Sequence, residues 1–403
     1  MAHECGTGVG PWQHGPMRHV SDDERRARLA VRHALAPGFR VDTPEAVTAA
    51  MTALHATEPP TVYLSCWARG DAIGAADVDR ALYRDRTLVK QLAMRRTLFV
   101  FPRDLLPAVW PSASARVAGN ERARMVKDAV TAGLAADGNE WLDRARAEVL
   151  AALAGEPRGL TAAEIRRAVP MIDFKIEVRP GEIWSAPRVL THLGATADIV
   201  RGANTGGWHL SRPRWTLMRH WLGEMPAPWS AADGYRELVR RWLRTFGPGT
   251  EDDIVWWLGA TKTVVRAALA ELEAVPVSLD RGATGWLLPD DQDEPPEPGP
   301  WAALLPVLDP TTMGWREREF HLGPHREQIF DRNGNGGATA WVDGRIVGCW
   351  VQDAQGVVRV HLLEKVSAAA RRSLDAEATR LTTRLGGFRV GSVYSSPAMK
   401  AAR

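Results

Sequence analysis

Three side chains that can do chemistry stand close together early in the chain: His55, Thr57 and Glu58. A histidine can accept or donate a proton near neutral pH, a threonine hydroxyl can hold a water molecule, and a carboxylate supplies negative charge. The Pro59-Pro60 pair that follows prevents an upstream helix from continuing. We predict that residues 55–58 form a fixed turn, called the elbow below, that acts on a bound polyanion.

The residues before the elbow have the apolar spacing of a helix over 44–54. Thr43 suits the N-cap and Pro44 the first helical position. On such a helix His55 would stand at the C-terminal end, where the helix dipole favours a histidinium. The sequence leaves a second interpretation open, in which His55 is a core histidine and Thr57 only caps the next helix.

A group of cations follows the elbow, set among alternating apolar residues near 87–92 and 97–101 that predict two strands. Its members are Arg84, Arg86, Lys90, Arg95 and Arg96. Two strands behind a helix-turn-helix form a wing, and wing cations contact DNA phosphates. We predict a DNA-binding wing here, with solvated charges on an exposed hairpin as the alternative.

Helices followed by two strands occur three times, which predicts an α+β chain of three tandem winged helix-turn-helix domains. In the third copy, Thr250 and Thr261 precede helices that end near 258 and 272, and Arg281-Gly282 separates two strands. The second copy opens with Thr161-x-x-Glu164, the spacing of a capping box.

The region after the third copy predicts a C-terminal antiparallel β domain or small barrel with a covering helix. Asp343-Gly344 suits a hairpin turn, 357–363 adds a strand, and a helix follows over about 367–385. The expected domains are a flexible N-terminal tail at 1–21, winged helices at 22–135 (with the elbow), 136–225 and 226–292, and the C-terminal β-rich domain at 293–403.

Composition and missing motifs exclude several classes of protein. No apolar run reaches membrane-spanning length, the first twenty residues lack a signal peptide's apolar stretch, and three distant cysteines suit neither disulfides nor a metal cage. We therefore expect a cytoplasmic protein without membrane contact. Phosphate-binding and zinc-peptidase motifs are missing, and the 331–336 loop has Val342 where a calcium loop needs glutamate. No metal or cofactor is expected.

The chain resembles the AlkZ-type winged-helix DNA glycosylases, a bacterial family that includes azinomycin-resistance enzymes and enzymes that unhook interstrand crosslinks. The resemblance runs over roughly residues 22 to 385, and its most specific segments are Leu54-His-Ala-Thr-Glu-Pro59, Tyr63-Leu-Ser-Cys-Trp-Ala-Arg69, Met94-Arg-Arg-Thr-Leu98 and Leu305-Pro-Val-Leu-Asp-Pro310. The family's catalytic motif is Gln-x-Gln or Gln-x-Asp, and its two positions fall on His55 and Thr57. Phe99 stands where many relatives have histidine.

The resemblance implies a monofunctional glycosylase that hydrolyses the N-glycosidic bond of bulky N7-alkylguanines in duplex DNA, as self-resistance to a DNA-alkylating natural product. His55 would hold or deprotonate the attacking water and Thr57 would fix it. Glu58 would support the sugar cation or, as we favour, cap the next helix. No lysine stands at the elbow itself, so lyase chemistry is not expected, and Lys90 is the only lysine expected near it. The implied partner is duplex DNA carrying alkylated guanine, and no protein partner is implied.

Two other functions stay open on the sequence alone. A non-catalytic winged-helix DNA-binding protein, such as a transcriptional regulator, would explain the wings and the arginines but has no use for a polar elbow. A housekeeping repair glycosylase for simple alkylpurines or crosslinks would share the mechanism and differ in the lesion that it removes.

Overall fold

The computed structural model describes residues 17–178 and 181–403. Residues 1–16 of the expected N-terminal tail lie outside the described residues. The rest of that expected tail is tied down, because β1 (His19–Val20) pairs in parallel with β9 (Val275–Leu279). β9 belongs to the third segment predicted as a winged helix, called the third repeat below. The prediction of a flexible tail is therefore wrong for residues 19 and 20, which complete a three-stranded sheet.

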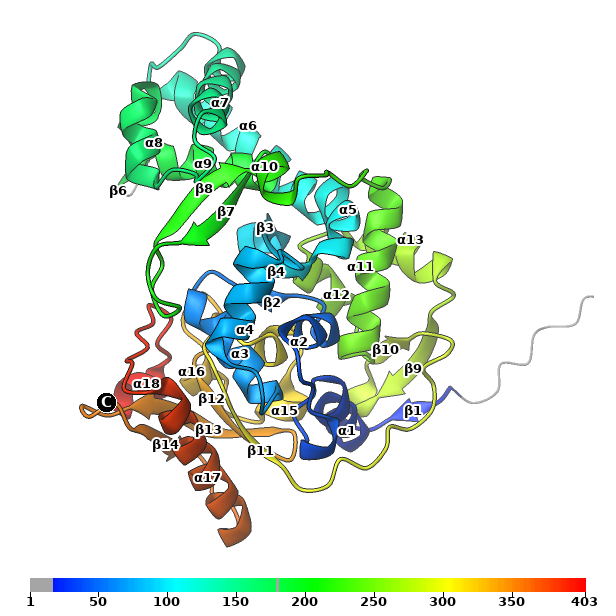
Figure 1. Cartoon of the computed structure of the whole chain (residues 1–403). Helices are drawn as coiled ribbons and strands as arrows, with labels where there is room; N and C mark the ends of the chain where they lie inside the picture. The colour runs from blue at the N-terminus through cyan, green and yellow to red at the C-terminus, as the bar shows by residue number, and fades with distance from the viewer. Residues whose placement is uncertain (1–16, 179–180) are drawn as a thin grey trace, which may run out of the picture.

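The first segment predicted as a winged helix, called the first repeat below, surrounds a three-stranded sheet in the order β2-β4-β3 (Figure 1). In chain order, its elements are α1 (Asp22–Arg32), α2 (Pro44–Ala50), β2 (Leu54–His55), α3 (Pro59–Arg69), α4 (Ala75–Asp79) with a π-helical turn (Arg80–Arg84), β3 (Leu88–Ala93) and β4 (Thr97–Pro102). The predicted hairpin of β3 and β4 is confirmed. The helix predicted over 44–54 is too long, because Thr52 adopts a left-handed backbone conformation (φ 63°) that no helix continues through. His55 is therefore a strand residue, and its predicted place at a helix C-terminus is wrong.

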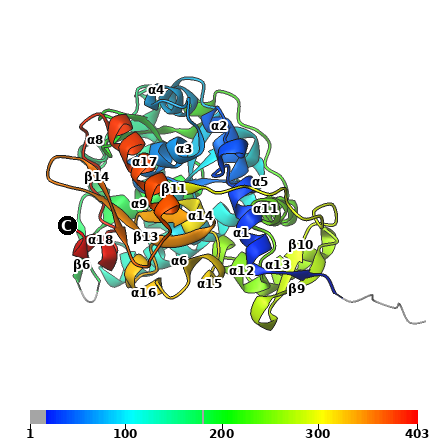
Figure 2. The same ribbon diagram turned by 90° about the horizontal axis from the view of Figure 1, so that it is seen from below.

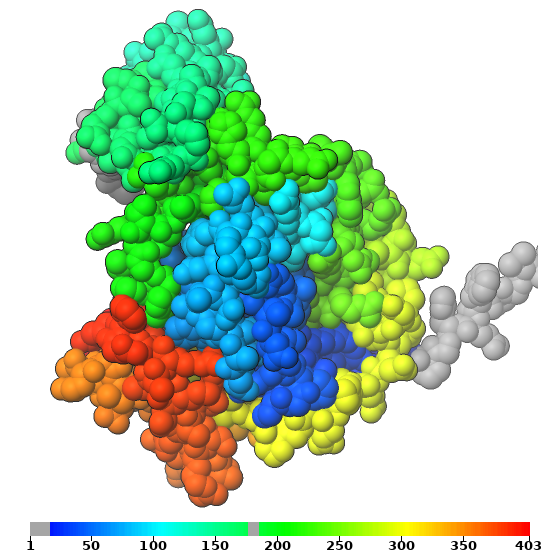
Figure 3. Space-filling model, viewed as in Figure 1, coloured from blue at the N-terminus to red at the C-terminus, as the bar shows by residue number. Residues whose placement is uncertain are grey.

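The second segment predicted as a winged helix, 136–225, lies mostly in a lobe that projects from the rest of the molecule around its own apolar core (Figure 3). Before it, α5 (Leu106–Val109) and a π-helical turn (Trp110–Ser114) pack in the main core, and α6 (Ala115–Thr131) leads into the lobe. The lobe contains α7 (Gly138–Ala154), α8 (Ala162–Ala168), β5 (Lys175–Val178), β6 (Gly181–Trp184), α9 (Ser185–Ala195), β7 (Ile199–Asn204) and β8 (Pro213–Leu217). α10 (Met218–Leu222) follows and packs again in the main core. The predicted capping box is confirmed, since the Thr161 backbone N–H donates to Glu164 Oε2 over 2.7 Å. The β5–β6 hairpin was not predicted.

The third repeat has the boundaries that its capping residues predict. It comprises α11 (Ala231–Phe246), α12 (Glu251–Leu258), α13 (Lys262–Glu271), β9 and β10 (Thr284–Leu287). The three segments predicted as winged helices share one strand pairing, in which the residues just before one helix (α3, α8 or α12) pair with the last strand of the segment. These pairs are β2 with β4, Leu160 with Trp215 of β8, and Gly249 with Trp286 of β10.

The C-terminal region is an antiparallel sheet of four strands in chain order, open at β11 and β14. Its elements are β11 (Ala302–Leu305), α14 (Pro310–Met313), α15 (Glu319–Leu322), α16 (Arg326–Ile329), β12 (Thr339–Val342), β13 (Arg345–Gln352), β14 (Val358–Leu362), α17 (Ala368–Leu385) and α18 (Pro397–Ala401). The predicted hairpin and covering helix are confirmed, and the barrel alternative is wrong for the described strands. Figure 2 shows α17 across the sheet, and Arg380 also joins it to α3 through the Trp67 carbonyl.

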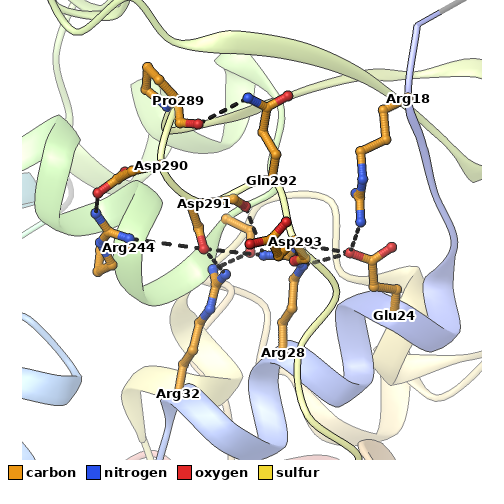
Figure 4. A network of polar contacts seen from close by, with 11 residues as sticks. Arg18, Glu24, Arg28, Arg32, Arg244, Pro289, Asp290, Asp291, Gln292 and Asp293 are labelled. Atoms are coloured by element: carbon orange, nitrogen blue, oxygen red, sulfur yellow. Dashed lines mark hydrogen bonds and ion pairs between the residues drawn. The ribbon is translucent and has the colours of Figure 1, made fainter.

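A strap, residues 288–301, connects β10 to β11 and passes α1 (Figure 4). Asp291 accepts hydrogen bonds from Arg32 Nη2 (2.6 Å) and Arg28 Nη1 (3.4 Å), and Arg28 also donates to two strap carbonyls. The Arg28 side chain is almost fully buried by these contacts. One continuous apolar core then joins the first repeat, the third repeat and the C-terminal sheet.

Candidate active site and DNA interface

The elbow begins in the short strand β2, and this strand decides which way the His55 side chain faces. His55 pairs with Phe99 of β4, and Phe99 pairs in turn with Gln91 of β3. Directly paired residues lie on the same face of a sheet, and neighbours along a strand lie on opposite faces. Lys90 therefore lies on the face away from His55, where its ammonium donates to the Tyr83 hydroxyl over 2.7 Å. The expectation that Lys90 stands beside the elbow is wrong.

The His55 ring is buried and has no hydrogen-bond partner among the described residues. His55 is 7% exposed, and its Nδ1 atom is buried without a hydrogen-bond partner. The ring packs edge-on against Phe99, with the two ring centroids 5.2 Å apart. Burial, and then the nearby charge of Arg95, lower the pKa of His55 to about 3. The histidinium expected from a helix dipole is therefore wrong, and the ring is a neutral imidazole at physiological pH. Such a ring accepts a hydrogen bond from water through its bare nitrogen.

The other two polar residues of the elbow, Thr57 and Glu58, differ in their hydrogen bonds. Thr57 is half-buried, and no described residue bonds its hydroxyl. Glu58 occupies the N-cap position of α3 but makes no capping bond with its side chain, so the predicted cap is wrong for both residues. Glu58 Oε1 instead accepts from Ser392 Oγ (3.0 Å) and the Val393 N–H (2.9 Å), and burial raises the pKa of this carboxyl. Glu58 thus ties the elbow to the C-terminal segment, and Thr57 is left with a free hydroxyl.

The helix that leaves the elbow is anchored by a buried ion pair. Arg69 donates from both terminal nitrogens to Asp309 at 2.9 and 2.7 Å, and neither side chain is exposed. Ser65 Oγ donates to the same carboxylate at 2.7 Å, and Thr61 Oγ1 donates to the Val307 carbonyl at 3.0 Å. Two of the segments that carry the family resemblance therefore meet in space. Their contact fixes α3, and α3 in turn fixes the elbow.

The five cations predicted as one DNA-binding patch do not form one surface. Arg84 is exposed and pairs with Asp85, whereas Arg86 lies 4.2 Å over the ring of Trp221 and donates to its carbonyl. Arg84 and Arg86 precede β3, and Lys90 lies within it. Arg95 and Arg96 form the turn beyond the far end of β3, so the expectation of a single patch is wrong.

A basic groove of about 300 Å³ opens at the Arg95 end of the hairpin. Its charged and polar lining consists of Arg95, Arg96, Arg116, Asn120, Glu121 and Arg124. Arg96 and Arg124 share Glu121 at 3.0 and 3.3 Å, and Arg116 donates to the Gly259 carbonyl at 2.7 Å. The arginines of α6 were missed from the sequence, because nothing local indicates that α6 lies beside the first wing.

The comparisons with known proteins bear on this arrangement directly. The model of the family described as DNA glycosylase AlkZ-like matches residues 48–384, which include the elbow, the groove and all four strands of the C-terminal sheet. The chain belongs to the AlkZ-like DNA glycosylase family. The solved structure of Streptomyces sahachiroi DNA glycosylase AlkZ has the same fold as this AlkZ-like chain, with a TM-score of 0.70 and 20% identity over 91% of this chain and 97% of that one. No protein with a curated function matches the AlkZ-like chain in sequence.

Membership of the AlkZ-like family confirms the expected class of activity. The chain is a DNA glycosylase, hence an enzyme that binds DNA, and the alternative of a non-catalytic regulator is not supported. Among the described residues, no helix is both long and apolar enough to cross a membrane.

Proposed function

We propose that this AlkZ-like glycosylase removes bulky N7-alkylguanines from duplex DNA, with His55 and Thr57 holding the attacking water, and that it protects its host from a DNA-alkylating natural product. The observation that supports this assignment of the site is the environment of the His55 ring. A neutral imidazole without a hydrogen-bond partner, in a strand that leads into an elbow with a free Thr57 hydroxyl, is costly to keep unless a ligand or water completes it.

This reaction does not require a strong general base. An N7-alkylated guanine is cationic and leaves readily, so the protein must place a water on the far side of the sugar and tolerate an oxocarbenium-like transition state. Because its pKa is about 3, His55 is a weak proton acceptor. We infer that the ring orients the water through one nitrogen and receives its proton only after the glycosidic bond has largely broken.

The proposal includes the way in which the protein holds DNA. The shared strand pairing of the three repeats supports three winged helices over about 22–135, 136–225 and 226–292, with a β-rich domain after them. The basic groove at the first wing would follow the phosphate backbone, with Arg96 and Arg124 as its exposed contacts. Lys90 lies across the sheet from the elbow, which supports hydrolysis without a lyase step.

The decisive experiment measures abasic-site formation on two duplexes, one with a bulky N7-alkylguanine and one with N7-methylguanine. We expect excision by the wild type, faster on the bulky adduct, and a loss of about a hundredfold or more in His55→Ala, in line with removal of a group that positions the nucleophile. His55→Gln, which restores the family's residue type, should retain most of the activity.

His220→Ala is the matched control, because that histidine is exposed on α10. Equal excision by His55→Ala and wild type would remove His55 from the mechanism. Preference for N7-methylguanine would assign the enzyme to repair of simple alkylpurines, and binding without any excision would contradict the proposal as a whole.

A further inference from the structure

Two arginines from distant segments lie against one indole ring. The guanidinium carbon of Arg95 is 4.0 Å from the ring centroid of Trp256 on α12, and that of Arg318, just before α15, is 5.0 Å from the same centroid. Arg318 also lies 4.3 Å from the ring of Phe330. We call Arg95, Trp256 and Arg318 the arginine clamp.

The backbone is shaped to bring Arg95 into this position. Arg95 has a left-handed conformation (φ 53°) in the turn between β3 and β4, and it packs against Gly259, the left-handed residue that ends α12. A Cβ on Gly259 would lie 3.3 Å from both the backbone N and the Cγ of Arg95, so a larger residue would crowd the turn. The close approach of these two segments therefore depends on glycine.

No described carboxylate neutralises the clamp. Neither guanidinium has an ion-pair partner within the described chain, and the Nε atoms of Arg95 and Arg318 are buried without hydrogen bonds. Asp253 acts on Arg318 from a distance, but its Oδ1 already accepts the backbone N–H groups of Arg316 and Glu317, both at 2.8 Å.

The other charges that act on Arg318 do not compensate for this deficit. Glu319 pairs with Arg326 at 3.0 Å, while Arg326 and Arg95 both repel Arg318. Burial accordingly lowers the pKa of Arg95 to about 10 and that of Arg318 to about 9. Arg318 is buried and Arg95 is half-buried. Two such like charges side by side without a counter-charge destabilise a protein, and a bound anion would relieve this.

We propose that the arginine clamp seats one phosphate of the DNA backbone, next to the nucleotide whose glycosidic bond is cleaved at the elbow. This inference rests on the proposed function. Guanidinium forks bind phosphate oxygens bidentately, and the Trp256 ring holds both forks in place. Arg95 is near enough to His55 for its charge to act on the imidazole, and it also lines the basic groove, so the clamp stands between the elbow and the path of the backbone.

A seated phosphate would also serve the chemistry. The sugar becomes positively charged as the glycosidic bond breaks, and two unneutralised guanidiniums nearby would oppose that charge. When a phosphate occupies the clamp, its negative charge cancels much of this repulsion. Excision is therefore favoured only where the backbone is correctly seated.

The test combines a charge scan of the DNA with variants of the clamp. Duplexes carry one N7-methylguanine and one neutral methylphosphonate, placed at each phosphate around the lesion in turn, and a 2′-fluoro version that resists excision is used for binding. We expect one position at which the wild type loses about tenfold or more in affinity and excision, as for a charge-assisted contact. In Arg318→Gln and Arg95→Gln, a methylphosphonate at the same position should change affinity and excision little, because these variants have already lost the arginine–phosphate contact.

Arg371→Gln on the exposed face of α17 is the control, and it should behave as the wild type. Thermal unfolding should show Arg318→Gln at least as stable as the wild type, since an uncompensated buried charge is removed. Two results would overturn the proposed role of the clamp. One is a scan in which no methylphosphonate position weakens binding or excision. The other is a methylphosphonate that costs the Arg95 and Arg318 variants as much as it costs the wild type. If the wild type excises nothing, the proposed function fails, and the binding scan still decides on the clamp.

Discussion

At the scale of single residues, the proposed site has an imidazole, His55, at the position that the family resemblance assigns to an amide side chain. An amide side chain can orient water but hardly accepts a proton, and a histidine held in its neutral form behaves in nearly the same way. Burial keeps His55 in that form, so the substitution is chemically milder than the change of residue type suggests. His33 and His321 are also buried, and burial lowers their pKa values too.

Buried neutral histidines predict a loss of stability in mild acid. In the unfolded chain these rings bind protons below a pKa of about 6.5, whereas in the folded protein the pKa values of His33 and His55 are about 3. The unfolded state therefore binds more protons between these limits, and stability should fall as pH drops below about 6.5, by up to about 1.4 kcal/mol per pH unit for each ring.

His321 gives a clean test of this prediction, because neither of its nitrogens has a partner and its neighbours include Trp315 and Phe320. Urea unfolding of wild type and His321→Phe between pH 5 and 7.5 should show a shallower loss in the variant. Parallel slopes would contradict the assignment of acid sensitivity to this ring.

At the scale of elements, α3 depends on the buried pair of Arg69 and Asp309, which joins the first repeat to the C-terminal region. Removing one charge leaves the other buried and unpaired, so Asp309→Asn should lower the free energy of unfolding by about 3–5 kcal/mol. The double variant Arg69→Met/Asp309→Leu should be less destabilised than this single variant, because no unpaired charge remains. Thermal or urea unfolding of both decides this, and an Asp309→Asn protein within about 1 kcal/mol of wild type would refute it.

At the scale of the whole molecule, the strap holds the third repeat and the C-terminal sheet against α1. Asp291 receives Arg28 and Arg32, whereas the neighbouring Asp290 is exposed and pairs with Arg244. Asp291→Ala should therefore speed limited proteolysis within 289–300 several-fold, since local opening becomes easier. Asp290→Ala is the matched control and should be cleaved like the wild type, and equal cleavage of the two variants would show that the strap is held by other contacts.

Local signals account for what the sequence determined by itself. Thr161, Thr250 and Thr261 begin their helices as predicted, because a capping hydroxyl bonds a backbone N–H only three residues away. The Asp343-Gly344 hairpin follows from two left-handed residues in sequence. The elbow rests on a local signal of the same kind, since polar residues beside a proline pair predict it, and the family resemblance assigns the catalytic positions to the same residues.

Tertiary structure decided what the side chains do. The left-handed Thr52 ends α2 early, and pairing with β4 then turns His55 away from the face that carries Lys90. Long-range packing likewise places Arg95 against the ring that Arg318 also contacts, more than two hundred residues away in sequence. Helix caps and turns depend on neighbours in the chain, whereas burial, charge balance and strand pairing depend on residues that only the folded chain brings together.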